Sequence, residues 1–538
     1  FVCSYLNACA FGVQAFCTRL CFRRASDTGT ISFDMDFLDP IKRRRHTIRL
    51  FTGYFLVAFI VLFSAIMIVY YASGYGITRQ GEVIQNGLVF VSSQPANAEL
   101  YIDGQRRNNT NTKLALPAGT YTFKIQKQGY QTWEKRVEIA GGEVDHVVYP
   151  LLIPNNLQTT SLTEFDSAPA LFTQSPDRKW IVMQHAGQDG AFEIYDTSRN
   201  VDQIVSERRQ IALPSGMVTA GSQGTTASWK LIEWSTNNRH MLLKRSFTVD
   251  GVAQYEYVLV DTQRPEGSYN LTRELGVNPT ELTLRDKQPT NYYVFDEEAG
   301  TLKTMDLGST DAETVANGVI EYKSHGRDEL LYVTQQDAPN GSANVRVRIG
   351  GKAYTVRTLA KTPSYVLDMA RYEGKWYITF GSVQDGRLYI YENPVEQIVA
   401  SSESKASPLF AMRLENVTDL SFSANAQFVG AQNGTRVHVY DIKHSRGYSY
   451  NAPFAFDLGA ENRFAEWMDG HRFIQPSDGN AQLFEYDGTN RRTLMPVSGQ
   501  FEAYFDRDYE NGFALAPRTD GQAGVALTIT PLLTEQDQ

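Results

Sequence analysis

The chain has 538 residues and a net charge of −9, from 51 Lys or Arg and 60 Asp or Glu side chains. Its length exceeds that of one ordinary domain, so we expect two or more folded units. The acidic balance argues against nucleic-acid binding, because phosphate contacts need concentrated Lys and Arg.

The first 34 residues differ from the rest of the chain. They show neither clear periodicity nor a cap or turn pattern, and they hold all four cysteines: Cys3, Cys9, Cys17 and Cys21. The spacings between these cysteines do not match a CxxC-type zinc site, so we expect no metal there. Met35 begins a short basic leader, so we expect residues 1–34 to be a non-native upstream segment. A genuine cysteine-rich tail and a truncated longer protein are the alternatives.

Residues 50–73 form an apolar run that is long enough to cross a bilayer, and no charged residue lies between Arg49 and Arg79. The core helices of soluble proteins are rarely apolar on every face. The preceding leader, residues 35–49, is basic, and basic segments stay on the cytoplasmic side. We therefore predict a single-pass signal anchor in the cell membrane, with the N-terminus inside and the bulk of the chain extracytoplasmic. A cleaved signal peptide would need a shorter apolar core.

After a linker over residues 74–86, residues 87–154 show the pattern of a small β module. Five segments alternate or run apolar over strand length, and glycines punctuate them as turns. The segments are LVFVSS, AELYIDG, GTYTFKIQK, EKRVEIA and DHVVYPLL. This pattern predicts a small antiparallel β-sandwich.

An ordered set of motifs in this module resembles the PEGA domain, a β-sandwich found in bacterial surface and envelope proteins. The motifs are SSQP at 92–95, LYIDG at 100–104, PAGTY at 117–121, GY at 129–130 and Trp133. The sequence departs from the family at residues 96–97, where the family has Glu-Gly, and at 112–113, where Thr-Pro is common. The family has no known catalytic residues, so the resemblance implies a spacer or adhesive module at the cell surface.

Residues 155–538 form a quasi-repeat built on a recurring hairpin. An apolar strand ends in a polar turn, and a second apolar or aromatic strand follows at once. The second strands are predicted to start near Trp180, Met241, Tyr292, Leu330, Trp376, Phe428, Phe473 and Phe513. This spacing is that of propeller blades, and most units show four strands.

The last unit shows only three obvious strands, which bears on how the ring closes. We expect the segment LQTTSLTEF, residues 157–165, to supply the fourth strand by pairing with GVALTITPLL. That arrangement gives eight blades. Seven is the alternative, because the third unit, residues 279–317, is thin.

One repeat also resembles a known propeller class. Ser175, Pro176 and Asp177, followed by Trp-Ile-Val, resemble the repeats of TolB-type propellers, a WD40-like architecture. The resemblance supports the fold and says little about the ligand, because propellers host many unrelated activities.

The search for catalytic or metal chemistry is negative. The exported part lacks a Gly-x-Ser-x-Gly nucleophile turn, and its histidines are scattered without HExxH spacing: His146, His185, His240, His325, His438, His444 and His471. The six tryptophans lie in or beside predicted strands, which favours core packing over sugar stacking: Trp133, Trp180, Trp229, Trp234, Trp376 and Trp467.

Residues 506–512, DRDYENG, are the one segment with alternating acids before a glycine. Such a pattern can wrap Ca²⁺, but the distal bidentate Glu is missing because position 517 is Pro. We therefore expect an ordinary hairpin turn, with no metal, no cofactor and no catalytic residues.

Two function classes remain. The first is a non-enzymatic, membrane-anchored envelope protein that displays a propeller for binding a protein or glycan partner. The second is a propeller enzyme, a glycan hydrolase or lyase acting through acidic residues of its funnel. A pair of funnel carboxylates with raised pKa values would favour the second. The binding residues, the partner and the oligomeric state are left open by the sequence.

Overall fold

The structure is a computed structural model. It describes residues 40–72, 74–77, 83–309, 311–401, 405–452, 465–499 and 501–537. The predicted upstream segment 1–34 lies outside the described residues, as do residues 35–39 of the leader and 78–82 of the linker. The chain divides into two compact units, residues 1–85 and 86–538, which are described separately.

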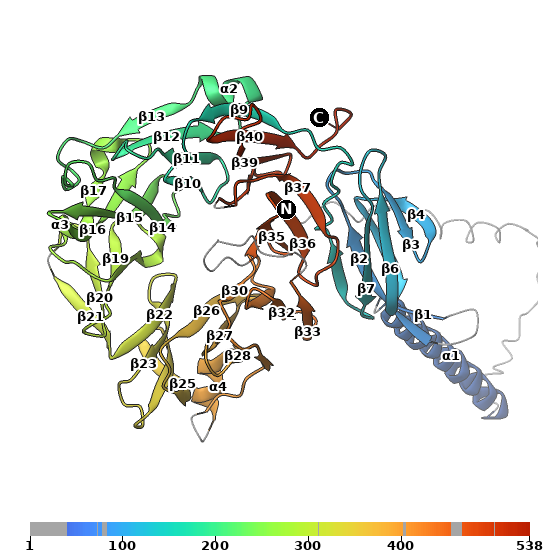
Figure 1. Cartoon of the computed structure of the whole chain (residues 1–538). Helices are drawn as coiled ribbons and strands as arrows, with labels where there is room; N and C mark the ends of the chain where they lie inside the picture. Colours follow the sequence, from blue (N-terminus) through green and yellow to red (C-terminus); the bar gives the residue numbers. More distant parts are fainter. Residues whose placement is uncertain are drawn as a thin grey trace, which may run out of the picture. The chain divides into compact units, whose positions relative to one another are not determined.

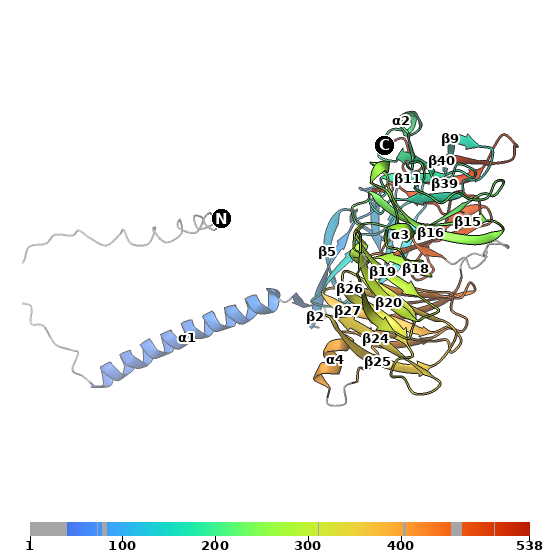
Figure 2. The same cartoon turned by 90° about the vertical axis from the view of Figure 1, so that its left-hand side faces the viewer.

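Helix α1, Pro40–Ala72, is the main element of the first unit (Figures 1 and 2). Proline is favoured in the first turn of a helix, and the basic residues after it are good helix formers, so α1 begins ten residues before the apolar run. One stretch, Arg44–Tyr70, is long and apolar enough to span a membrane, and none of its most apolar window is buried. Beyond α1, the short strand β1, Tyr75–Ile77, pairs antiparallel with the start of β2, Val83–Val91.

Residues 86–154 form the predicted β-sandwich. The first sheet contains β2, β5 (Thr112–Pro117) and β8 (Val144–Val147), and the second has the order β4-β3-β6-β7. The bounds of the second sheet are β3 Glu99–Ile102, β4 Gln105–Asn109, β6 Gly119–Gln126 and β7 Trp133–Ile139. The structure differs from the prediction in two respects: β4 and β5 are additional strands, and β8 pairs with β2 in parallel. The core is closed by fully buried apolar residues such as Val89, Leu100 and Phe123.

The described residues from 160 to 531 form eight four-stranded antiparallel sheets, which we number 1 to 8 in chain order. Sheets 1 and 2 contain β10 Leu171–Gln174, β11 Trp180–Gln184, β12 Ala191–Asp196 and β13 Arg209–Ala212, then β14 Ser228–Trp234, β15 His240–Val249, β16 Val252–Asp261 and β17 Tyr269–Asn270. Sheets 3 and 4 contain β18 Glu281–Leu284, β19 Asn291–Asp296, β20 Thr301–Asp306 and β21 Ala312–Asn317, then β22 Val319–His325, β23 Glu329–Thr334, β24 Ser342–Ile349 and β25 Lys352–Ala360.

Sheets 5 and 6 contain β26 Tyr365–Tyr372, β27 Lys375–Ser382, β28 Arg387–Glu392 and β29 Phe410–Arg413, then β30 Asp419–Phe422, β31 Phe428–Gln432, β32 Arg436–Asp441 and β33 Arg446–Asn451. Sheets 7 and 8 contain β34 Glu466–Trp467, β35 Arg472–Ser477, β36 Asn480–Glu485 and β37 Arg492–Pro496, then β38 Tyr504–Phe505, β39 Asn511–Pro517, β40 Val525–Pro531 and β9 Thr160–Phe165. Three short helices lie between strands: α2 Val201–Ser206, α3 Leu271–Glu274 and α4 Pro394–Ala400.

The sheets surround a common centre, so the predicted β-propeller is confirmed (Figure 1). Every second strand begins within two residues of its predicted start. The thin third repeat forms a complete four-stranded sheet. The predicted closing strand is also confirmed, because β9 pairs antiparallel with β40, with Phe165 opposite Val525.

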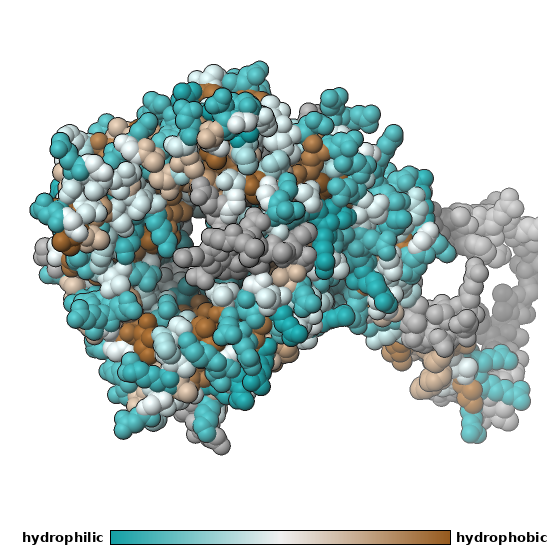
Figure 3. Space-filling view, in the orientation of Figure 1, coloured by the Kyte–Doolittle hydropathy of each residue, from teal (hydrophilic) through white to brown (hydrophobic). Residues whose placement is uncertain are grey.

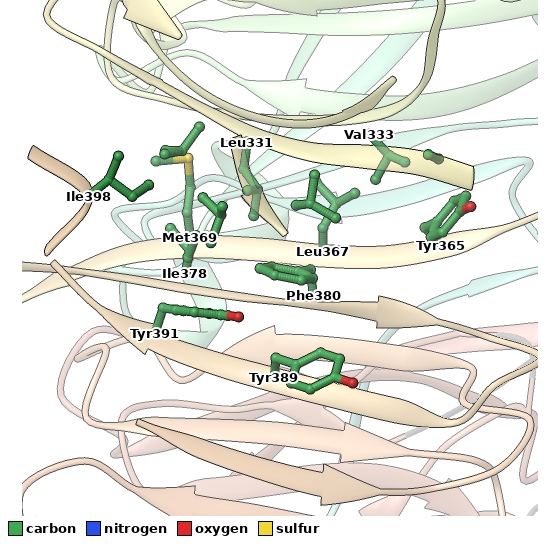
Figure 4. Close-up of a cluster of buried hydrophobic side chains, with 14 residues drawn as sticks. Leu331, Val333, Tyr365, Leu367, Met369, Ile378, Phe380, Tyr389, Tyr391 and Ile398 are labelled. Carbon is green, nitrogen blue, oxygen red and sulfur yellow. The ribbon is translucent and has the colours of Figure 1, made fainter. Parts of the chain in front are cut away.

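The core of the propeller lies between neighbouring sheets. Leu331 and Val333 of sheet 4 face Leu367, Ile378 and Phe380 of sheet 5 (Figure 4). Because each sheet is covered on both faces, its second strand is buried along its length, which is why those strands read as continuous apolar runs. Burying one such side chain contributes about 2 kcal/mol.

Candidate functional site

The propeller has two distinguishable ends. The first strands labelled in Figure 1, β10, β14, β22, β26 and β30, lie nearest the centre. Successive strands are antiparallel, so the turns after first and third strands lie at one end, and the connections after second and fourth strands lie at the other. We call these ends the hairpin end and the connection end, and each candidate feature can be assigned to one of them.

Carboxylates from five consecutive first strands form what we call the inner acidic cluster. Its members are Glu233 of β14, Glu281 of β18, Glu321 of β22, Asp368 of β26 and Asp419 of β30. Three of them stand at or near the start of their strands, so they lie toward the connection end. A space-filling view shows the molecule hollowed at the centre of the ring (Figure 3).

Burial and mutual repulsion disfavour the charged form of three of these carboxyls. Burial raises the pKa of Glu321 to about 7, and the charge of Glu281 adds to the shift. Burial likewise raises the pKa of Asp419 to about 6, with the charge of Asp368 adding to it. The pKa of Glu281 is raised by burial and by Glu233. Glu321 and Asp419 can therefore exchange protons close to neutral pH. A cation placed near these carboxylates would reduce the repulsion between them.

Lysine side chains and backbone amides partly balance the cluster. Lys323 Nζ lies 3.5 Å from Asp368 Oδ1. Asp368 also accepts hydrogen bonds from the backbone N–H of Met369, at 3.0 Å, and from that of Phe422 in sheet 6, at 2.9 Å. Asp368 thereby joins sheets 5 and 6.

A separate cavity of about 190 Å³ lies at the connection end of sheets 1 and 2. Of the two charged residues that line it, Arg245 is buried and ion-paired with the other, Asp189, and, at 2.6 Å, with Glu256. Glu256 also accepts hydrogen bonds from Thr219 and Asn270. Because these charges already satisfy one another, the network fixes the long connection between sheets 1 and 2.

The β-sandwich is fixed to the hairpin end through a buried ion pair. Lys135 of β7 lies 2.6 Å from Glu485 and 3.2 Å from Asp487 of sheet 7, and its side chain is only 3% exposed. The Trp133 indole also donates a hydrogen bond to Glu485. Burial alone would lower the pKa of Lys135, but the neighbouring Glu485, Tyr486 and Asp487 outweigh it and raise the pKa. The lysine is therefore held in its charged form.

Aromatic rings enclose this ion pair. Tyr149, which follows β8, stacks on His471 of sheet 7 with ring centroids 4.2 Å apart. The Lys135 ammonium lies 3.8 Å from the centroid of the Tyr486 ring, a cation–π contact. Burial lowers the pKa of His471 to about 4, so the imidazole is neutral at physiological pH.

The contact extends to sheet 6 and to the end of the chain. Asp145 of β8 lies 3.0 Å from Lys443, in the turn between β32 and β33. After β40, Asp537 accepts hydrogen bonds from Lys127, at 2.5 Å, and from Tyr130, at 2.9 Å. The β-sandwich is thus attached both to sheets 6 and 7 and to the segment that leaves the closing sheet.

The other residues singled out in the sequence, the tryptophans and the 506–512 segment, take part in core packing and in a turn. All six tryptophans pack in or against buried apolar clusters. In the 506–512 turn, Asp506 accepts hydrogen bonds from the Glu510 N–H and the Asn511 side chain, as in an ordinary turn. Within the described ranges, no three His, Cys, Asp or Glu side chains are grouped so as to hold a metal ion.

Sequence reasoning missed the inner acidic cluster and the interface. The five carboxylates lie in different repeats, and none is remarkable within its own strand. The signal that could have found them is an acid in the first strand of five consecutive units. Lys135 sits on an alternating strand, WEKRVEI, and its partners lie about 350 positions further along the chain.

Comparisons with known proteins place the small module. Residues 86–152 match the PEGA domain family model. The resemblance predicted from the motifs is confirmed for this segment. A comparison with curated proteins finds none that matches the chain.

Several solved structures are similar to the chain at low identity. Oligogalacturonate lyase from Vibrio parahaemolyticus is 10% identical, with a TM-score of 0.34 over 71% of this chain and 98% of its own. Hsv2p of Kluyveromyces lactis is 10% identical, with a TM-score of 0.32 over 66% and 96%. Dipeptidyl peptidase 4 of Porphyromonas gingivalis is 11% identical, with a TM-score of 0.32 over 61% and 50%. At this level of similarity no activity carries over to the present chain.

Proposed function

We propose that the protein is a non-enzymatic, membrane-anchored binding protein of the cell envelope. The PEGA domain holds the propeller by its hairpin end, and the connection end receives the partner. The observation that carries this proposal is the buried Lys135–Glu485–Asp487 network. A module fixed through a buried ion pair covers part of the hairpin end, so the connection end is the end left for a partner.

The topology follows from helix α1 and the basic leader that precedes its apolar part. The basic residues hold the N-terminus inside, and the PEGA domain and propeller lie outside the membrane. The match of residues 86–152 to the PEGA domain family supports an extracytoplasmic location, because this family implies a module at the cell surface.

The inner acidic cluster favours a partner with positive charge, such as a basic protein segment or an amino-sugar-containing glycan. Burial first, and then the neighbouring carboxylates, raise the pKa values of three of its carboxyls, and a cation placed among them would relieve the repulsion. Complementary charge of this kind governs specificity and association rate more than total affinity.

Affinity capture from cell envelopes with the full chain tests the proposal. The triple variant Glu281→Gln, Glu321→Gln, Asp419→Asn should capture at least tenfold less partner than the unaltered chain. The matched control, Glu373→Gln, Asp311→Asn, Glu313→Gln, removes the same number of carboxyls from exposed positions at or near the hairpin end and should capture the partner normally. Equal capture by both variants would mean that the inner acidic cluster is not the binding site.

A second candidate function is acid–base catalysis on an envelope polysaccharide. It is favoured by one observation: on first strands of the same ring, the pKa of Glu321 is raised to about 7 and that of Asp419 to about 6, values suited to a proton donor and acceptor near neutral pH. Release of reducing ends from envelope polysaccharide, abolished by Glu321→Gln, would replace the binding proposal with this one.

A further inference from the structure

His471 lies at the centre of the contact between the PEGA domain and the propeller. It belongs to the turn between β34 and β35, and its ring stacks on Tyr149 with an interplanar angle of 6°. The edge of Phe428 from sheet 6 approaches from another side, with centroids 5.5 Å apart. The imidazole is therefore enclosed by the PEGA domain and by two sheets of the propeller.

Four charged groups, from its own turn, the PEGA domain and sheet 6, influence the protonation of the His471 ring. Arg472 and Asp469 come from its own turn, Lys135 comes from the PEGA domain, and Asp441 comes from sheet 6. The two cations disfavour a proton on His471 and the two carboxylates favour it. Burial, to which the stacked Tyr149 ring contributes, is the largest influence, and it disfavours the proton.

We infer that the PEGA domain is a proton-sensitive clamp on the propeller, closed while His471 is neutral and released when His471 takes up a proton. The inference goes beyond the proposed binding function, because it concerns how the propeller is held and requires no partner. Release would leave the PEGA domain joined to the propeller only through the chain before β9.

The direction of the pH effect follows from the two environments of the ring. In the closed state the pKa of His471 is about 4, whereas a solvated imidazole has its ordinary value of 6.5. As the pH falls below 6.5, His471 becomes protonated in the released state while it stays neutral in the closed state. The closed state is therefore disfavoured progressively down to about pH 4, with a maximum effect of about 300-fold on the equilibrium, reached if release exposes His471 fully.

A second histidine at the interface does not reverse this effect. The pKa of His444 is raised, first by its hydrogen bond with Asp441, at 2.7 Å, in the same sheet. Both residues belong to the propeller, so this bond persists in the open state. The PEGA carboxylate that faces His444, Asp145, is farther away, at 3.8 Å.

Single-molecule energy transfer in the full chain, held in detergent, tests the clamp. Dyes are attached at Asn108→Cys in the PEGA domain and Ser407→Cys in the propeller, with the four native cysteines replaced by Ser. We expect one narrow distribution at pH 7 and growth of a second, broad one between pH 6.5 and 4. His471→Phe keeps an aromatic ring against Tyr149 but cannot be protonated, so it should remain closed at pH 4.5.

His325→Phe is the matched control, because it removes an imidazole of the propeller that contacts Trp376 and not the PEGA domain. It should open like the unaltered chain. If His471→Phe fails to fold, as judged by circular dichroism, His471→Gln serves in its place, with the same resistance to acid expected. The clamp would be overturned if the unaltered chain stays closed at pH 4. It would also be overturned if the His471 variant opens over the same pH range as the unaltered chain.

Discussion

Removing the ammonium of Lys135 should detach the PEGA domain from the propeller at a large energetic cost. The variant Lys135→Met keeps the length and packing of the side chain but leaves Glu485, whose side chain is 3% exposed, without its cation. Asp487 loses a partner at 3.2 Å, and the Tyr486 ring loses its cation–π contact.

The magnitude follows from the burial of the pair. Breaking a buried ion pair by removing one partner costs about 3–5 kcal/mol, because the other charge stays desolvated. An exposed pair in the same module provides the control: Arg106 lies 3.0 Å from Glu99, with side chains 58% and 43% exposed. Loss of such a surface pair costs about 0–1 kcal/mol, so Arg106→Met should be nearly silent.

Urea titration of the full chain in detergent, followed by tryptophan fluorescence, measures the difference. Trp133 is buried beside Lys135 and donates to Glu485, so its emission reports directly on the interface. We expect the transition of Lys135→Met to move to clearly lower urea than that of Arg106→Met. The double variant Lys135→Met, Glu485→Leu should recover part of the loss, because the buried Glu485 charge is gone and Asp487, whose side chain is 14% exposed, is the carboxylate left without its cation. A loss under about 1 kcal/mol for Lys135→Met would refute the view that this pair holds the domain.

Three further predictions concern closure, protonation and topology. A chain that begins at Ser167 lacks β9, which leaves the edge of β40 unpaired. It should therefore aggregate more and melt at a lower temperature than a chain that begins at Asn155. Equal melting temperatures would count against closure by β9. The pKa of Glu321 is raised by burial from 4.5 to about 7, so its charge penalises folding above pH 7, and the penalty fades as the pH falls toward 4.5. Glu321→Gln should therefore stabilise the fold by about 1–3 kcal/mol at pH 8 and have little effect at pH 4.5, by thermal unfolding; a gain independent of pH would contradict this assignment. Replacing the basic residues 42–45 with Glu should weaken or invert the orientation of the anchor. In the unaltered chain, protease added to spheroplasts should remove a C-terminal tag. A tag that stays protected would contradict the assignment of the propeller to the outside.

The fold was largely predictable from local patterns. Second strands such as FVGAQ read as continuous apolar runs because both faces of their sheets are covered, and the closing strand 160–165 was found by counting strands in the last repeat. The extent of α1 was underestimated, because basic residues continue a helix as readily as apolar ones.

The candidate sites depend on contacts between distant parts of the chain, and no local pattern encodes those. Glu281 meets Glu321, and Asp368 meets Asp419, only when their strands are placed around one centre. Lys135 looks like an exposed residue of an alternating strand, and only the docked structure shows that sheet 7 covers it. The position of His471 beneath Tyr149 likewise requires the fold of two separate modules.

The central claim, that the partner engages the connection end of the propeller, can be tested by photo-crosslinking in intact cells. A photoreactive amino acid at Glu298, in the turn between β19 and β20, reports on the connection end. One at Glu373, in the turn between β26 and β27, reports on the hairpin end, and both positions are exposed. We predict a crosslinked partner from position 298 and none from position 373; a partner captured only from position 373 would contradict the account.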